Sequence, residues 1–130
     1  VYKRQEGGRI IDRAWVRAAL AKIKAGLDVI ELQNWKQAWA IDNDRLQPAE
    51  ASALKVNSSE FFVEAYRLFM EVLGEQSSIK ETSPGSVLRA HAERYYRSLI
   101  VFTFGGGTNE VQRDLIAAMG LGLPRHGYGR

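Results

Sequence analysis

The fold of this chain is decided by the stretch Val16-Arg-Ala-Ala-Leu-Ala-Lys-Ile-Lys-Ala-Gly-Leu-Asp-Val-Ile30. Its large apolar residues recur every three or four positions, which places them along one side of an α-helix; they are Val16, Leu20, Ile23, Leu27 and Ile30. Charged residues such as Lys22 and Asp28 occupy the other sides. The pattern predicts an amphipathic helix from about Ile11 to Asp42.

A second long helix is predicted from Pro48 to Leu73. Proline is favoured in the first turn of a helix, and Gly74 is a natural helix stop. The apolar face of this segment contains Ala51, Leu54, Phe61, Ala65, Leu68 and Val72. Because only the short break Asn43–Leu46 lies before its start, the two helices are expected to form an antiparallel pair.

A third helix is predicted to begin near Ser86, after the polar stretch Glu75–Gly85, whose Ser-Pro-Gly end is typical of a turn. This helix continues to Leu99. The following run Leu99–Phe104 also has the β-branched and aromatic content of a strand. We interpret it as buried helix.

A fourth helix is predicted from Asn109 to Met119, because Gly120 and Pro124 follow and end the helical pattern. The sequence contains no internal repeat and no low-complexity segment. The predicted fold is therefore all-α, an antiparallel (up-and-down) four-helix bundle over residues 9–125. Residues 1–8 are expected to be disordered or a remnant of truncation, cloning or sequencing, and residues 126–130 a flexible tail.

The composition is that of one globular domain. The 130 residues are 45% hydrophobic and 25% charged, and no apolar run reaches the length of a membrane span. The absence of cysteine excludes disulfides and thiolate chemistry. Lysine and arginine alternate with acidic residues despite a net charge of +3, which argues against a nucleic-acid partner. We expect a soluble, cytoplasmic protein.

Three consecutive glycines precede the fourth helix, in the run Phe104-Gly-Gly-Gly-Thr-Asn-Glu-Val-Gln-Arg113. A turn without side chains allows a ligand to approach the backbone closely, and the helix start offers N–H groups to an anion. Thr108 can cap the helix or donate its hydroxyl to a ligand. The alternative is a plain helix–helix connection with a threonine cap.

The stretch from Phe104 to Arg125 resembles the closing signature of acyl-CoA dehydrogenases, in particular a bacterial branch that ends in Gly-Leu-Gly-Leu-Pro-Arg. The resemblance implies the carboxy-terminal helical domain of an enzyme that holds FAD, of either the homomeric or the heteromeric type. Such enzymes oxidise the Cα–Cβ bond of an acyl-CoA to a trans-2-enoyl-CoA in fatty-acid or sterol side-chain β-oxidation. It also implies electron-transfer flavoprotein as the acceptor and a homo- or hetero-oligomer. The alternative is a non-catalytic helical partner subunit that serves assembly only.

The resemblance also implies roles for the residues of the turn. Gly107 would lie against the acyl-CoA, and Thr108, Asn109 and Glu110 would contact FAD. Many family members carry the catalytic glutamate two residues before the threonine, at the position of Gly106 here, so this chain has no predicted catalytic residue. The base then lies on an earlier helix or on a partner subunit, or the chain is not catalytic. A glycine there would also leave room for a bulky acyl group such as a sterol side chain.

Two further runs depart from the family pattern. The run Glu71–Glu75 lacks the glutamine and the second glycine that contact a neighbouring subunit's FAD, and Gly7–Ile10 replaces an Arg-x-x-Phe-Gly run. Both losses suggest that a neighbour's flavin is not supported in the usual way.

Several other residues could be interpreted as functional. The tryptophans could line an acyl tunnel but at helical spacing are expected in a core or interface; they are Trp15, Trp35 and Trp39. Tyr95 and Tyr96 are expected to serve packing. His91 and His126 lie far apart in the sequence, so no metal site is predicted.

Overall fold

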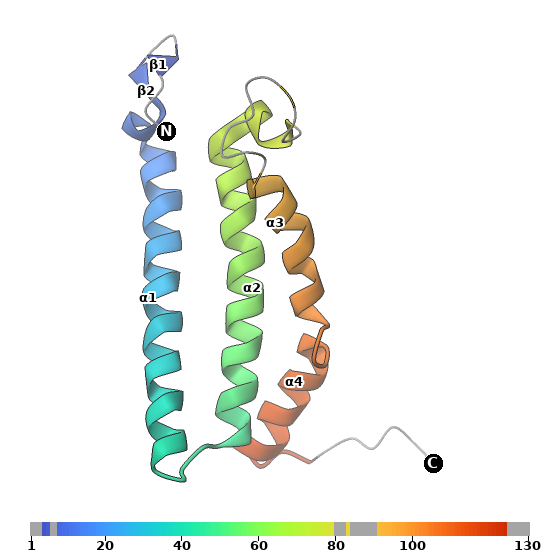
Figure 1. Cartoon of the computed structure of the whole chain (residues 1–130). Helices are drawn as coiled ribbons and strands as arrows, with labels where there is room; N and C mark the ends of the chain where they lie inside the picture. Colours follow the sequence, from blue (N-terminus) through green and yellow to red (C-terminus); the bar gives the residue numbers. More distant parts are fainter. Residues whose placement is uncertain (1–3, 6–7, 80–82, 84–90, 125–130) are drawn as a thin grey trace.

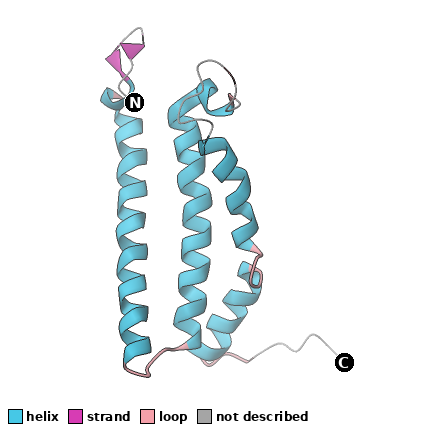
Figure 2. Ribbon diagram, in the orientation of Figure 1, coloured by secondary structure: helices cyan, strands magenta, loops and turns pink. Residues whose placement is uncertain are grey.

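The computed structural model describes residues 4–5, 8–79, 83 and 91–124, and almost all of these residues are helical (Figure 1 and Figure 2). The α-helices are α1 (Ala14–Asp42), α2 (Pro48–Leu73), α3 (His91–Leu99) and α4 (Asn109–Leu115). Shorter helical turns are η1 (Ile10–Asp12), η2 (Gly74–Ser78), η4 (Ile100–Thr103) and the π-helical η5 (Ile116–Gly120). A small antiparallel pairing joins β1 (Arg4–Gln5) to β2 (Gly8–Arg9).

Helix α2 is the centre of the fold. It packs against α1 on one side and against α3, α4 and η5 on the other, and α1 and α2 run antiparallel (Figure 1). Helix α3 runs back along α2, and α4 follows it in the same direction toward the start of α2. The predicted all-α antiparallel bundle is confirmed, and the structure adds that α3 and α4 share one side of α2.

The predicted boundaries agree with the structure closely for α2, which spans Pro48–Leu73 with Pro48 in its first turn and Gly74 after its last. Helix α1 begins three residues later than the predicted Ile11, after the 3-10 turn η1. The predicted helix start near Ser86 lies outside the described residues. The predictions for residues 1–8 and 126–130 also fall largely or wholly outside them.

The run after Leu99 forms the 3-10 helix η4. The prediction of a helical backbone is therefore correct, whereas the prediction that its side chains are buried is wrong. Four large apolar side chains of this region are 43–58% exposed; they are Ile100, Val101, Phe102 and Phe104. A 3-10 helix has three residues per turn, so its side chains do not keep the single stripe that α-helical spacing would bury.

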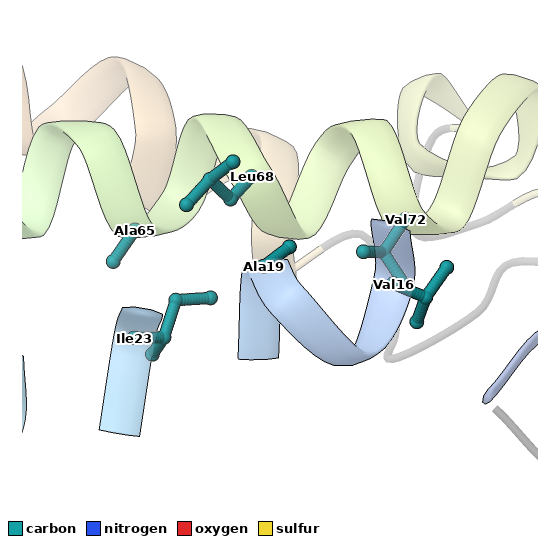
Figure 3. Close-up of a cluster of buried hydrophobic side chains, with 6 residues drawn as sticks. All are labelled: Val16, Ala19, Ile23, Ala65, Leu68 and Val72. Atoms are coloured by element: carbon teal, nitrogen blue, oxygen red, sulfur yellow. The ribbon is translucent and has the colours of Figure 1, made fainter. Parts of the chain in front are cut away.

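The core lies between α1 and α2 and is built from residues three or four positions apart on each helix (Figure 3). Helix α1 contributes Val16, Ala19 and Ile23, and α2 contributes Ala65, Leu68 and Val72. The alanine on each helix allows the two backbones to approach closely, and Phe61 and Leu20 close the edges of the cluster. The predicted stripe on α1 is thus confirmed at Val16 and Ile23.

The tryptophans of α1 are not core residues. Trp35 is 69% exposed and Trp39 is 54% exposed. Leu27 of the predicted stripe is also 43% exposed. The core alternative is therefore wrong for Trp35 and Trp39, and the interface alternative stays a prediction.

A charged network on the surface links α1 to α2. The carboxylate of Glu64 accepts hydrogen bonds from Arg67 Nε (2.6 Å) and Nη2 (2.8 Å) and from Lys22 Nζ (3.0 Å). These bonds, with that from Arg67 the strongest, lower the pKa of Glu64 from 4.5 to about 2. Arg67 also pairs with Glu71 one turn further along α2.

This network predicts an acid-dependent loss of stability. Because the pKa of Glu64 is lower in the folded chain than in the unfolded chain, its contribution is complete above pH 4.5 and is lost as the pH falls toward 2. The side chain is 35% exposed, so solvent screening limits the loss to about 1 kcal/mol. Urea titrations from pH 6 to pH 2 should show a flatter profile for Glu64→Gln than for the unmodified chain. Glu31→Gln, on the exposed side of α1, is the matched control and should leave the profile unchanged.

Candidate functional site

The glycine turn Gly105–Gly107 connects η4 to the start of α4. Gly106 has φ of 71° and Gly107 has φ of 102°, both in the left-handed region that side chains disfavour. A Cβ added at Gly106 would meet no atom within 4 Å, whereas one at Gly107 would lie 2.8 Å from Gln112 Nε2. The position that the family resemblance assigns to a catalytic glutamate therefore faces open space.

Thr108 is the N-cap of α4. Its Oγ1 accepts a hydrogen bond from Val111 N at 3.3 Å, as the sequence predicted for a capping threonine. Glu110 follows in the first turn and is exposed. The pKa of Glu110 is lowered because its carboxylate accepts from its own backbone N–H and then from the Thr108 hydroxyl. Both side chains lie at the surface, where a ligand can reach them.

Asn109 is placed differently from its neighbours, because its side chain is buried against α2 and only 3% exposed. Its Nδ2 donates to Ser59 Oγ (3.0 Å) and to Glu60 Oε1 (3.2 Å). Arg113, one turn further along α4, donates to the same Glu60 oxygen at 2.6 Å. Asn109 and Arg113 therefore attach α4 to α2, and the predicted contact of Asn109 with FAD stays a prediction.

Lys55 is a residue of this site that sequence reasoning missed. Its Nζ donates to Asn109 Oδ1 (2.6 Å), to Gly107 O (2.7 Å) and to Thr103 O (3.3 Å). The available signal was the interruption of the apolar face of α2, where the buried Ser52 and Ser59 flank the lysine. Small polar residues on a buried face indicate that a polar partner packs there.

An apolar cavity of about 390 Å³ adjoins the turn, between α2 and the α3–η4 segment. Its lining is mainly aromatic and aliphatic; it consists of Lys55, Ser58, Ser59, Phe62, Tyr66, Tyr95, Leu99, Phe102 and Gly105. The rings of Tyr66 and Tyr95 pack with centroids 5.6 Å apart, so Tyr95 serves packing here as predicted. The cavity can accept an apolar group that reaches it past the glycine turn.

A second cavity, of about 360 Å³, lies at the opposite end of α2, where the sequence departs from the family's flavin-contacting runs. Its lining includes Arg13, Trp15, Glu71 and Glu75. Glu71 is paired with Arg67, and the guanidinium of Arg13 lines the same cavity as the two carboxylates. The expectation that a neighbour's flavin is not held there in the usual way stays a prediction.

The described part of the chain has two further properties that bear on function. Its histidine and acidic side chains form no group of three or more that could hold a metal ion. None of its helices is long and apolar enough to cross a membrane.

Comparisons with known proteins agree with this architecture. The chain matches the family described as "Acyl-CoA dehydrogenase, C-terminal domain" over residues 2–121. It is 48% identical to acyl-CoA dehydrogenase FadE26 of Mycobacterium tuberculosis over 122 residues, which cover 92% of this chain and 30% of that protein. The chain thus spans about a third of the length of such relatives.

Solved structures give the same result. The chain resembles a chain of the ChsE4–ChsE5 complex of Mycobacterium tuberculosis with a TM-score of 0.87 and 48% identity, over 95% of this chain and 32% of that one. A chain of the Tcur3481–Tcur3483 steroid ACAD matches with a TM-score of 0.85 and 42% identity, over 89% of this chain and 30% of the other. By family match, identity and fold, this chain belongs to the acyl-CoA dehydrogenase family and forms its C-terminal helical domain.

Proposed function

We propose that this chain is the C-terminal domain of an FAD-dependent acyl-CoA dehydrogenase that converts a bulky acyl-CoA thioester to the trans-2-enoyl-CoA. The observation that carries the proposal is the glycine turn, which opens outward at Gly106 and adjoins the apolar cavity beside α2. The resemblance of the turn to the family signature and the membership of the chain in the family support the same function.

The residues of the turn fit a flavin and a thioester. Gly107 has no side chain, and Gly106 beside it faces open space, so a ligand can approach the backbone of the turn closely there. Thr108 and Glu110 are exposed at the start of α4, where a hydroxyl and a carboxylate can hydrogen-bond to FAD. When bound, FAD supplies the redox chemistry by accepting a hydride from the acyl β-carbon.

The base that removes the α-proton is proposed to lie outside this chain, on an earlier helix of the parent protein or on a partner subunit. Gly106 offers no proton acceptor, and among the side chains near the turn Glu60 is already engaged by Arg113 and Asn109. A general base must come within hydrogen-bond reach of the proton that it removes. Two of the similar solved structures are complexes or pairs of two named proteins, which supports a shared site.

The substrate class is proposed to be a steroid or sterol side-chain acyl-CoA. The absence of a side chain at Gly106 leaves open space where many family members have a glutamate, and the neighbouring cavity of about 390 Å³ adds apolar volume. One similar structure is a steroid ACAD. Electron-transfer flavoprotein is the proposed acceptor of the electrons.

The parent protein should be purified alone and together with any co-encoded homologue, and its flavin absorbance followed during titration with a steroid acyl-CoA. FAD that bleaches with the parent alone would place the base on an earlier helix. FAD that binds or bleaches only with the homologue would make this chain one half of a shared site. If neither occurs in any combination, the proposal fails. The second candidate, a non-catalytic subunit for assembly, would then account for the glycine at position 106.

A further inference from the structure

The ammonium group of Lys55 is the link between α2 and both ends of the glycine turn. Its three hydrogen bonds go to Thr103 O before the turn, to Gly107 O at its end and to Asn109 Oδ1 at the start of α4. An ammonium has three N–H donors, so this geometry uses its complete donor capacity. A single side chain thus joins three points that lie within seven residues of the sequence.

The turn needs such a link because its glycine backbone can adopt many conformations. Gly106 and Gly107 both occupy the left-handed region, and glycine loses more conformational freedom on ordering than any other residue. Gly105 N donates to Val101 O at 2.7 Å, which holds the first residue of the turn to η4. The carbonyl oxygen of Gly106 accepts a long hydrogen bond from Gln112 Nε2, at 3.4 Å. The path of the turn therefore depends on where Lys55 holds its two ends.

The ammonium group of Lys55 is hydrogen-bonded to three neutral oxygens, and its charge also helps to lower the pKa of the nearby Glu110 carboxylate. Among the described residues no carboxylate forms a salt bridge with Lys55, whereas lysines of α1 do form them, such as Lys22 with Glu64. Thr103 O belongs to the C-terminal end of η4, where carbonyl oxygens carry partial negative charge. Hydrogen bonds from a charged donor are stronger than those between neutral groups, so Lys55 connects α2 to the glycine turn more strongly than a neutral donor would. The side chain of Lys55 also lines the apolar cavity beside Gly105.

We propose that Lys55 is a positioning residue for the substrate-facing turn: it holds Gly105–Gly107 in the one arrangement that presents the turn to the acyl-CoA. The proposal rests on the proposed function for its effect on the reaction. Its effect on the backbone of the turn is independent of that function. Substrate affinity and turnover should therefore depend on Lys55 more than the stability of the domain does.

The test uses the full-length parent with its partner subunit and compares Lys55→Met with Lys22→Met. Both variants keep an unbranched apolar side chain and lose one ammonium that links α2 to another segment. Lys55→Met is expected to raise KM for the acyl-CoA about tenfold and to speed amide hydrogen exchange at residues 104–112 by a similar factor. Lys22→Met should leave both unchanged. Lys55→Gln keeps an amide donor and should fall between Lys55→Met and the unmodified protein.

The outcomes separate this proposal from the proposed function. If the unmodified complex has no dehydrogenase activity but exchange at residues 104–112 rises only in the Lys55 variants, the function fails and the positioning role stands. If the complex is active and Lys55→Met matches Lys22→Met in KM and in exchange, the positioning role is overturned. It is also overturned if both Lys55 variants lose the folded complex while Lys22→Met retains it, because Lys55 would then act on folding alone.

Discussion

Replacing Gly26 by alanine is expected to destabilise the chain by about 2 kcal/mol, although alanine is the better helix former by about 1 kcal/mol. Gly26 lies in the middle of α1, opposite α2. A Cβ at this position would fall 2.0, 2.4 and 2.9 Å from three ring carbons of Phe61. The ring cannot stay in place at such distances, and moving it removes packing from the edge of the α1–α2 core. Urea unfolding followed by helical circular dichroism measures the change.

A double-mutant cycle gives the sharper form of this prediction. In a Phe61→Ala background the clash is absent, so Gly26→Ala should stabilise the chain by about 0.5–1 kcal/mol, the helix-propensity gain alone. The sign of the same substitution thus reverses with the residue at position 61. If Gly26→Ala stabilises the chain in both backgrounds, Phe61 does not occupy the space above Gly26.

Gly26 also shows where sequence reasoning reaches its limit for this fold. The spacing of Val16, Ile23 and Ile30 predicts one buried side of α1, and all three are buried. By helix propensity alone, Gly26 is an unfavourable residue within α1. The periodicity of α1 does not show that the ring of Phe61 on α2 lies opposite this glycine. The close approach of two helices depends on the residues of both segments, and the periodicity of one segment does not identify its neighbours on the other.

The exposed tryptophans of α1 illustrate a second limit. Side-chain size and helical spacing favour burial for Trp35 and Trp39, yet among the described helices α1 packs mainly against α2, and both rings are more than half exposed. The apolar residues of a helix match all the surfaces that the helix packs against, and such surfaces can belong to other segments or other chains. The sequence shows which residues of α1 are apolar, but it does not show which partner covers each of them.

The candidate site divides in the same way. The glycine turn and its capping threonine were predictable, because glycine and an N-cap residue have local backbone roles that are readable from a few neighbouring residues. Lys55 and Ser59 were not, because they meet Asn109 across about 50 residues of sequence. The buried state of Asn109 follows from those distant partners and not from the signature around it.

Asn109→Leu is the second substitution with a large expected effect, a loss of about 2–4 kcal/mol in the free energy of unfolding. Leucine has a similar volume but cannot bond to Lys55, Ser59 or Glu60, so three polar groups of α2 lose a partner at a site that is 3% exposed. Urea unfolding and hydrogen exchange in α4 measure the change. Exchange should rise most in α4, because Asn109 attaches that helix to α2.

Asn57→Leu is the matched control, because it makes the same chemical change on α2 itself. Asn57 Nδ2 donates a single hydrogen bond, to Gln33 Oε1 at 2.8 Å, and the side chain is only partly buried. Its loss should cost about 1 kcal/mol or less, and α4 should keep its protection. Equal losses for the two variants would show that Asn109 is no more than an ordinary surface contact.

In the full-length parent, the same variant separates two roles that the family signature does not distinguish. If Asn109 acts by attaching α4 to α2, Asn109→Leu should lower flavin occupancy and stability together. Glu110→Gln alters an exposed side chain next to it, whose carboxylate accepts hydrogen bonds from its own backbone N–H and from Thr108, so it should lower flavin occupancy while the urea midpoint stays unchanged. Flavin loss in Asn109→Leu with full stability would instead mean that Asn109 leaves α2 to contact the cofactor directly. The ratio of flavin loss to stability loss therefore decides which residues of the signature bind FAD and which hold its binding surface in place.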